Sequence, residues 1–373
     1  MTGDSPLAMK PQQHSVDDDP DLLDLMMRDA ERQSGVWQPQ AKWRDYARRI
    51  DRELRRVGLA DFRSNQDILS GFTEGGLPRP AMPHGRFKRL MWDRIATLPV
   101  VRRIVGEYEH LLLGQHRSKL SANKSHARMM LDRIADTVDH FEPPAGMDAG
   151  GGDDTFIWRG RAVSAAWVQY VSRAVDLYRS VDRSAVGSIL EIGPGLGFST
   201  LAHFALNPEL RLVVNVDIPP VLYVATQFLK AIPGLTVVDY RQTRDLDRID
   251  LTLPPAPERR VYQLAPWQIA RLAGEVDVGL NAASFAEMSP EVCANYARHV
   301  CAAVRHTVML HTFPPEEATD DGPLSGRYLV GLFADAFPRT TVLDSGWCDD
   351  YVFYDTYKRE GAGGYAAVLL QRG

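Results

Sequence analysis

Short apolar runs alternate with helix-like segments through the second half of the chain. The runs expected to form strands cover residues 188–192, 211–217, 260–264, 276–280, 307–311, 340–343 and 364–370. Between them, apolar side chains recur at the spacing of an amphipathic helix. This alternation predicts an α/β fold, in which a mostly parallel sheet carries helices on both faces.

The first half of the chain has helical periodicity and no strand-like alternation before residue 150. Residues 42–58, for example, place their apolar side chains on one face and end at a glycine, a common helix stop. We therefore expect a disordered tail over residues 1–18, an all-helical N-terminal domain over 19–145 and a sheet domain over 155–373. The N-terminal domain could act as a lid, in substrate binding or in oligomerisation. The stretch 143–154, rich in glycine and proline, is the expected linker, and it could also form a lid over the site.

Two segments of the sheet domain follow the pattern less clearly. Residues 163–179 have helical spacing and lead directly into the first strand, so we predict a helix there. Residues 235–259 begin with a short apolar run, 235–238, that could be a strand, but they continue with charged residues and prolines. We interpret this segment as an insertion between the second and third strands.

The most informative stretch is 188–200, where an apolar strand enters a Gly-x-Gly-x-Gly turn and a helix follows. Gly193, Gly195 and Gly197 have no Cβ, so the backbone can pass close to a bound molecule. The spacing differs from the Gly-x-Gly-x-x-Gly of dinucleotide-binding folds. Glu191, two residues before the first glycine, suits a ligand with a cationic amino group. A glycine turn without a ligand is the alternative.

A second acidic residue, Asp217, ends the next strand. It follows Gly197 by about 20 residues, the usual spacing to an acid that binds the ribose hydroxyls of a nucleotide. Asp217 could instead cap the following helix, because the next residues are Ile218, Pro219 and Pro220, and proline suits a first helical turn. The two roles are compatible, and the pair of strand ends predicts a nucleotide-like ligand.

Other polar residues follow later strands, where ligands of open parallel sheets bind. After the third strand, Trp267 could pack on an adenine ring and Gln268 could bond its edge, although a core tryptophan is the alternative. After the fourth strand, the stretch 281–288 turns polar and carries Glu287, a candidate base or a brace for the next helix. His311 ends the fifth strand, near the expected mouth of the crevice.

Composition limits the classes of function. The 373 residues, 45% apolar and 24% charged, are enough for about two domains. The net charge of −5 argues against nucleic-acid binding through bulk charge. We expect a soluble cytoplasmic protein, because no apolar run is long enough to span a bilayer and the acidic N-terminus is not a signal peptide. Three cysteines without a CxxC pair disfavour a disulfide framework or a zinc site.

Together these motifs resemble the class I S-adenosyl-L-methionine (SAM) dependent methyltransferases, and more narrowly the sugar O-methyltransferases of bacterial natural-product and polysaccharide pathways. The segments that carry the resemblance are 191–195, 216–219, 281–288 and the Asp61-Phe62-Arg63 kernel. The resemblance spans most of residues 40–373, and 284–288 is its most selective part. It implies a Rossmann-like sheet with a C-terminal antiparallel hairpin, SAM as cofactor and methylation of a sugar hydroxyl.

The resemblance also implies roles for individual residues. The cofactor would be bound by Glu191, Gly193, Gly195, Gly197, Asp217, Ile218, Pro266, Trp267 and Gln268. The catalytic side would comprise His311, Glu287, Asn281 and Ser284. A hydroxyl is a poor nucleophile until a base accepts its proton, and a neutral histidine held by a carboxylate does this well. We therefore expect His311 as base with Glu287 as its partner, and a structural histidine is the alternative.

Several alternatives remain at this point. They are a non-sugar small-molecule O- or N-methyltransferase, a nicotinamide oxidoreductase, and a catalytically silent methyltransferase fold that binds a partner through its helical half. The glycine spacing counts against the oxidoreductase. The expected partners are a small-molecule or glycosidic acceptor and, through apolar faces of the N-terminal helices, a second copy of the chain. Asp349 and Asp350 could join Glu287 around a metal, but adjacent loop aspartates are usually solvated, so we predict no metal.

Overall fold

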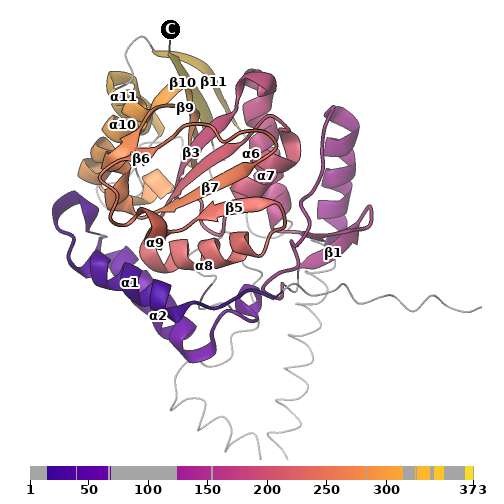
Figure 1. Ribbon diagram of the computed structural model, residues 1–373. Coiled ribbons are helices and arrows are strands. Elements are labelled where there is room, and N and C mark those ends of the chain that lie inside the picture. The colour runs from indigo at the N-terminus through magenta and orange to yellow at the C-terminus, as the bar shows by residue number, and fades with distance from the viewer. Residues whose placement is uncertain are drawn as a thin grey trace, which may run out of the picture.

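The fold is built on one central sheet with helices on both faces (Figure 1). A computed structural model of the chain describes residues 15–38, 40–65, 68, 124–152, 154–282, 284–313, 324, 326–336, 340–347 and 366–372. The sequence predicts three helices between residues 84 and 140, broken near residue 99 and around 114–121. The first two lie outside the described residues, and in the third, residues 124–137 are helical. Among the described residues, no helix is both long and apolar enough to cross a membrane.

The central sheet has eight strands in the order β11-β12-β10-β9-β3-β4-β7-β5. Their bounds are β3 Ser188–Ile192, β4 Leu212–Val216, β5 Leu235–Val238, β7 Arg259–Leu264, β9 Val276–Ala282, β10 Val304–Phe313, β11 Thr340–Trp347 and β12 Ala366–Arg372. All neighbours are parallel except β12, which is antiparallel to both β10 and β11. A mostly parallel sheet with a C-terminal antiparallel hairpin is the fold class predicted from the sequence, so that prediction is confirmed.

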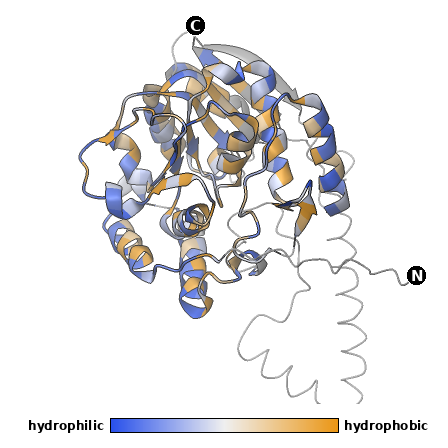
Figure 2. Ribbon diagram, turned by 45° about the vertical axis from the view of Figure 1, so that its right-hand side comes forward, coloured by the Kyte–Doolittle hydropathy of each residue, from blue (hydrophilic) through white to orange (hydrophobic). Residues whose placement is uncertain are grey.

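Helices bury both faces of this sheet. They are α1 Pro20–Glu31, α2 Ala41–Val57, α6 Trp167–Ser180, α7 Phe198–Leu206, α8 Pro219–Lys230, α9 Tyr240–Thr243, α10 Pro290–Ala303 and α11 Gly326–Ala336. Successive strand residues point to opposite faces, so Ile189 joins the core under α6, α7 and α8 while Leu190 joins the core under α10 and α11. Burial on both sides explains why the strands are continuous apolar runs, which Figure 2 shows at the centre of the molecule.

The N-terminal helices α1 and α2 pack against α8 and share its hydrophobic core. The core contains Leu22 and Met26 from α1 and Ile50 from α2, all without exposed surface. Val16 and Asp18, within the expected tail, are also placed: Val16 is buried and Asp18 accepts a hydrogen bond from Tyr223. Over the described residues, the N-terminal region is therefore joined to the sheet by a common core.

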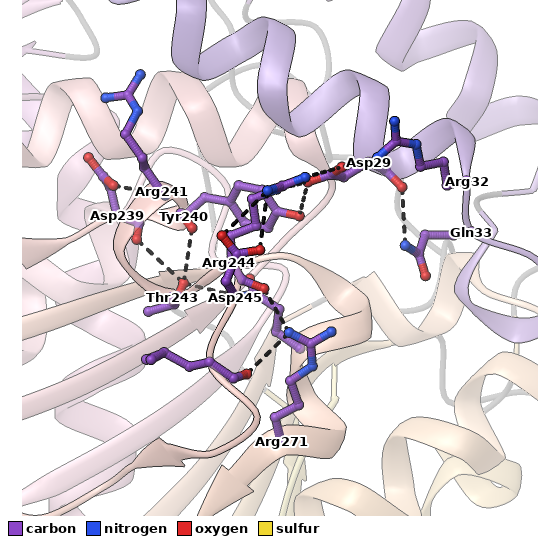
Figure 3. A network of polar contacts seen from close by, with 12 residues as sticks. Asp29, Arg32, Gln33, Asp239, Tyr240, Arg241, Thr243, Arg244, Asp245 and Arg271 are labelled. Atoms are coloured by element: carbon purple, nitrogen blue, oxygen red, sulfur yellow. Dashed lines mark hydrogen bonds and ion pairs between the residues drawn. The ribbon is translucent and has the colours of Figure 1, made fainter.

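A buried carboxylate ties α1 to α9 (Figure 3). Asp29 accepts hydrogen bonds from the Tyr240 hydroxyl at 2.9 Å and from the Arg244 guanidinium, whose Nε lies 2.5 Å away. The Arg244 hydrogen bond, more than any other contact, lowers the pKa of Asp29 below its ordinary value. Nearer the start of α1, Arg241 bonds both oxygens of Asp19, at 3.0 and 3.1 Å. These ion pairs fix the direction in which α1 crosses the molecule.

The glycine-rich stretch 143–154 forms a packed turn rather than an open linker. The guanidinium of Arg63, itself buried, donates to the main-chain oxygens of Met147 at 2.6 Å and Ala149 at 3.4 Å, and to Asp154 at 2.8 Å. A Cβ on Gly150 would lie 2.2 Å from the ring of Phe62. The Asp61-Phe62-Arg63 kernel thus holds this turn.

Two predictions about segments of the sheet domain are partly wrong. The segment starting at residue 235 is not simply an insertion, because Leu235–Val238 is the edge strand β5, parallel to β7. Residues 163 and 164 are not helical either: they belong to β2 Arg161–Ser164, which pairs with β1 Thr155–Trp158 in a hairpin. The hairpin turn has positive φ at Arg159 and Gly160, the geometry of a two-residue type I′ turn.

Candidate functional site

A cavity of about 310 Å³ opens at the C-terminal ends of β3, β4 and β9. Its lining combines the glycine turn after β3, Asp217 after β4, three residues of α6, the start of α10 and residues 36–46 of the N-terminal region. This is the edge of the sheet at which the sequence places a ligand. A ligand there would contact main chain, carboxylates and aromatic rings at once.

The glycine turn follows β3 with three left-handed residues. Gly193, Gly195 and Gly197 have φ of +72°, +60° and +84°, values that side chains with a Cβ rarely adopt. A Cβ on Gly193 would lie 2.5 Å from the Ser284 hydroxyl oxygen. Gly193 and Gly195 line the cavity, and Gly197 is the N-cap of α7. The turn therefore exposes bare main chain to the ligand.

Asp217 braces this turn from the neighbouring strand. One of its carboxylate oxygens accepts the Gly195 N–H at 3.0 Å, and the other accepts the Ile218 N–H at 2.7 Å. Desolvation by burial raises the pKa of Asp217 to about 7, against the effect of these two hydrogen bonds. Each oxygen has a further lone pair, so the carboxylate can still accept hydrogen bonds from ligand hydroxyls in the cavity.

Glu191 lies beneath the turn with an unsatisfied oxygen. The residue is 2% exposed, its Oε2 has no hydrogen-bond partner among the described residues, and it lines the cavity. Burial raises its pKa to about 7, although a hydrogen bond from Ser199 and the charge of Arg173 act in the opposite direction. A buried, unpartnered carboxylate oxygen beside a cavity is suited to a cationic ligand group.

Arg173 is a cavity residue that the sequence analysis did not select. It lies on α6, one turn after Gln169, and both line the cavity. Its guanidinium stacks over the ring of Tyr170, with the central carbon 5.2 Å from the ring centroid. Arg173 places a positive charge near Glu191, so the cavity can accommodate both ends of a zwitterionic amino acid. The one sequence feature that could have indicated this role is the position of Arg173 on the helix that precedes β3.

Asn281 and Ser284 support the glycine turn. The Asn281 amide donates to the main-chain oxygen of Ile192 at 2.8 Å and to the Ser284 hydroxyl, while its own oxygen accepts the Phe285 N–H at 3.1 Å. Ser284 also donates to the Ile192 oxygen, at 3.1 Å. Ser284 lines the cavity and Asn281 is buried behind it. Their hydrogen bonds thus hold the end of β3, the strand that carries the turn.

The structure brings Pro266 and Ile218 to the cavity, but not their neighbours Trp267 and Gln268. Trp267 is 8% exposed and meets the Tyr240 ring edge-on, with centroids 6.0 Å apart. The Gln268 amide accepts the Ala265 N–H at 2.8 Å and donates to Thr243 at 3.0 Å. The interactions of these two side chains favour a structural role in closing the loop after β7.

Of the expected base and its partner, Glu287 lies at the cavity with an exposed side chain. His311 is described through its backbone only: it lies on β10, paired with Ala282 of β9, and Ala282 lines the cavity. The register therefore puts residue 311 one strand away from the cavity wall. Whether these two side chains meet stays a prediction.

The N-terminal region contributes one wall of the cavity, through residues that were not among the predicted site residues. Trp37, Trp43 and Tyr46 are half-buried and line the cavity, together with the amides of Gln38 and Gln40. Nothing in the local pattern distinguishes these aromatic residues from ordinary core positions of an amphipathic helix. Their role depends on α1 and α2 packing onto α8, which a local pattern does not show.

Acidic, histidine and cysteine side chains do not gather into a metal site in the part of the chain that the structure describes. Asp349 and Asp350, the aspartates considered as ligands, lie outside that part. Cys293 and Cys301 are buried and unbridged.

Comparison with known proteins gives distant similarities only. No protein-family model and no curated protein matches the chain. Solved structures similar to it include magnesium protoporphyrin IX methyltransferase (ChlM) from Synechocystis PCC 6803 with bound SAH, at 12% identity and a TM-score of 0.36, covering 56% of this chain and 83% of that one. The mitomycin 7-O-methyltransferase MmcR has 16% identity and a TM-score of 0.37, covering 55% of each chain.

A third similar structure is human N-acetylserotonin methyltransferase (ASMT) in complex with SAM, at 12% identity and a TM-score of 0.36. The match covers 56% of this chain and 54% of that one. Similarity at this level assigns no activity, cofactor or substrate to this chain.

Proposed function

We propose that this protein is a SAM-dependent O-methyltransferase whose acceptor is a hydroxyl of a sugar or of a glycosylated small molecule. The observation that carries the proposal is the unpartnered buried carboxylate oxygen of Glu191, a residue that lines the cavity below a turn of left-handed glycines. With Asp217 beside the same turn, this is a site for a nucleoside that also carries an amino group. The fold of the sheet is consistent with the proposal.

The residues of the cavity fit the parts of SAM. Glu191 would hold the ammonium of the methionyl group and Arg173 its carboxylate. The glycine turn would let that arm approach the main chain, since a Cβ at Gly193 has no room. Asp217 would accept hydrogen bonds from the ribose hydroxyls. When bound, SAM supplies a methyl group made electrophilic by the sulfonium.

The chain must then activate the acceptor hydroxyl. We assign proton acceptance to His311, with Glu287 holding the second nitrogen of its ring, because a neutral, oriented histidine accepts a proton near neutral pH. Ser284 and Asn281 would act by positioning the cofactor turn, given their bonds to the Ile192 oxygen. The sugar acceptor is supported by the resemblance of residues 281–288 and by the mixed aromatic and amide wall of the cavity.

Titration calorimetry with S-adenosylhomocysteine (SAH), with NAD as the comparison ligand, tests the proposal. We expect SAH to bind and NAD not to bind. Asp217→Asn should weaken SAH binding by about tenfold or more, since a hydrogen bond to a charged group contributes about 1.5–3 kcal/mol. Absence of heat with SAH, or equal binding of NAD, would refute the assignment.

A further inference from the structure

One side of the cavity is formed by residues of the N-terminal region. The described residues 36–38 and 40–46 extend from the end of η1 Gly35–Trp37 into the second turn of α2, and six of them line the cavity. None of these residues belongs to the glycine turn or to the strand ends that fit the cofactor. The segment therefore provides recognition surface separate from the cofactor site.

This segment is anchored by contacts that precede it and by contacts near its start. Before it, α1 is tied to α9 by the Asp29 contacts with Tyr240 and Arg244 (Figure 3). Within it, Trp37 packs edge-on against Tyr296 of α10, with ring centroids 6.2 Å apart, and lies 5.6 Å from the ring of His299. The wall is thus preformed, and an acceptor would not have to order it.

The chemistry of the wall is aromatic and amide. The rings of Trp43 and Tyr46 lie 5.5 Å apart at an angle of 40°, and both are half-buried. Gln38 and Gln40 add amides that can both donate and accept hydrogen bonds. Aromatic faces attract the C–H groups on the apolar side of a sugar ring, because the face of a π-system is negative and C–H groups are slightly positive. Amides suit hydroxyls at the rim of the same ring.

The charged groups of the cavity lining disfavour an anionic acceptor. The described lining holds three acidic side chains, those of Glu191, Asp217 and Glu287, and one guanidinium, that of Arg173, which lies near Glu191. The guanidinium of Arg49 lies over the Tyr46 ring, with its central carbon 4.7 Å from the ring centroid, but Arg49 is not among the described residues that line the cavity. A phosphate inside the cavity would therefore meet more acidic groups than cations.

We propose that residues 36–46 form the acceptor subsite, and that Trp43 and Tyr46 stack on the apolar face of an uncharged sugar ring that carries no phosphate. The proposal rests on the proposed methyltransferase function and adds the substrate class and the residues that select it. Gln38 and Gln40 bond the hydroxyls of that ring, which distinguishes it from a flat phenol.

Saturation-transfer NMR on the SAH-loaded protein tests this with three matched probes: p-nitrophenyl β-D-glucopyranoside, its 6-phosphate, and p-nitrophenol. The same set is repeated with the galactoside and mannoside. We expect saturation of the sugar-ring protons of at least one uncharged glycoside, binding at least about tenfold weaker for its phosphate, and no stronger binding of p-nitrophenol.

The variants separate acceptor from cofactor binding. Trp43→Ala should weaken the glycoside at least about tenfold, and Trp43→Phe, which keeps an aromatic face, by no more than about threefold. Both should leave SAH affinity within about twofold, which also reports that they fold. Arg52→Ala, an exposed position of α2 away from the cavity, is the matched control and should change neither.

Failure of the proposed function and failure of the acceptor subsite would give different experimental results. No SAH binding by the wild-type protein would refute the proposed function, and this inference with it. If SAH binds, four results would overturn the acceptor subsite alone. The glycoside phosphate could bind more tightly than the uncharged glycoside, or saturation could be confined to the phenyl protons. Alternatively, no glycoside could bind at all, or Trp43→Ala could leave the glycoside affinity unchanged.

Discussion

At the scale of single residues, the turn after β3 leaves no room for a side chain at its first glycine. Gly193 combines a left-handed φ of +72° with Ser284 in the place a side chain would occupy. Gly234 has a similar φ of +83°, but nothing lies within 4 Å of the place that a Cβ would take there. A comparison of alanine substitutions at the two glycines therefore distinguishes the cost of a left-handed backbone from the cost of a steric clash.

We expect Gly193→Ala to lose SAH binding by more than tenfold and to destabilise the protein by more than the roughly 1–2 kcal/mol that a left-handed alanine costs. Gly234→Ala should lose only the stability that a left-handed alanine costs, and its affinity for SAH should stay unchanged. Urea unfolding and calorimetry on both variants provide the measurement. Equal behaviour of the two variants would mean that the contact with Ser284 does not constrain the turn.

The buried Glu191 makes stability depend on pH. Its folded-state pKa is raised to about 7, above the ordinary value near 4.3, so between these values the folded state binds more protons than the unfolded state. The free energy of unfolding should therefore fall as pH rises through this window, by up to about 3–4 kcal/mol from this residue.

Glu191→Gln removes that titration. Relative to the wild-type protein, we expect the variant to gain stability steadily from about pH 4.5 to pH 8, while losing SAH affinity at every pH. Urea unfolding of both proteins at pH 5 and pH 8 measures the difference. Parallel pH profiles would show that Glu191 titrates normally.

Sequence reasoning found the residues whose position is fixed by a strand end. Glu191 and Asp217 could be predicted as site residues because each lies where a parallel strand ends. Trp267 and Gln268 follow the same rule, yet Gln268 caps its own loop, and a local pattern cannot tell these uses apart. Trp43 was recognised as apolar, but its cavity role depends on contacts far along the chain.

At the scale of elements, Arg63 controls the turn 143–154. Removing a partner from a buried ion pair typically destabilises a protein by about 3–5 kcal/mol, because the remaining groups stay buried without it. Arg63→Met would leave Asp154 and two main-chain oxygens without their donor. The turn should loosen, and β1 after it should lose its anchor.

We expect Arg63→Met to destabilise the protein by about 3 kcal/mol or more. Arg55→Met is the matched control, since Arg55 pairs with Asp24 and Asp51 but is half exposed, and should cost less than about 1 kcal/mol. Chemical denaturation of the two variants makes the comparison. A similar cost for both would show that the Arg63 contacts contribute little.

Helices and strands were predictable where pattern and caps agree. The helix α10 begins as expected, with Ser289 accepting the Val292 N–H at 3.4 Å and Pro290 at its first position. The strand β5 was considered but not chosen, because its four residues are only partly buried at the sheet edge and charged residues and prolines follow. The hairpin of β1 and β2 was missed because a single turn at Arg159 and Gly160 is a weak signal beside a long helix.

At the scale of the whole molecule, the described part of the N-terminal region and the sheet share one hydrophobic core. Local sequence suggested a boundary near residues 145–155 because composition changes there. Composition cannot show that Leu22, Met26 and Ile50 pack onto α8. We therefore expect α1, α2 and the sheet to unfold together.

Native-state hydrogen exchange measures this directly. Buried amides of α1 should open with a free energy within about 1–2 kcal/mol of that of the amides in β3, because both belong to one cooperative unit. Asp29→Asn should lower the protection of α1 selectively, as it weakens the link to Arg244. Exchange of α1 at a much lower free energy in the wild-type protein would indicate an independent N-terminal domain.

The separation of residues 36–46 from the glycine turn has an evolutionary consequence. The part of the gene that would choose the acceptor is short, contiguous and distinct from the part that would bind the methyl donor. Substitutions within it can redirect the enzyme to a new hydroxyl while the donor site remains intact. A graft of this segment between related enzymes should carry acceptor preference with it.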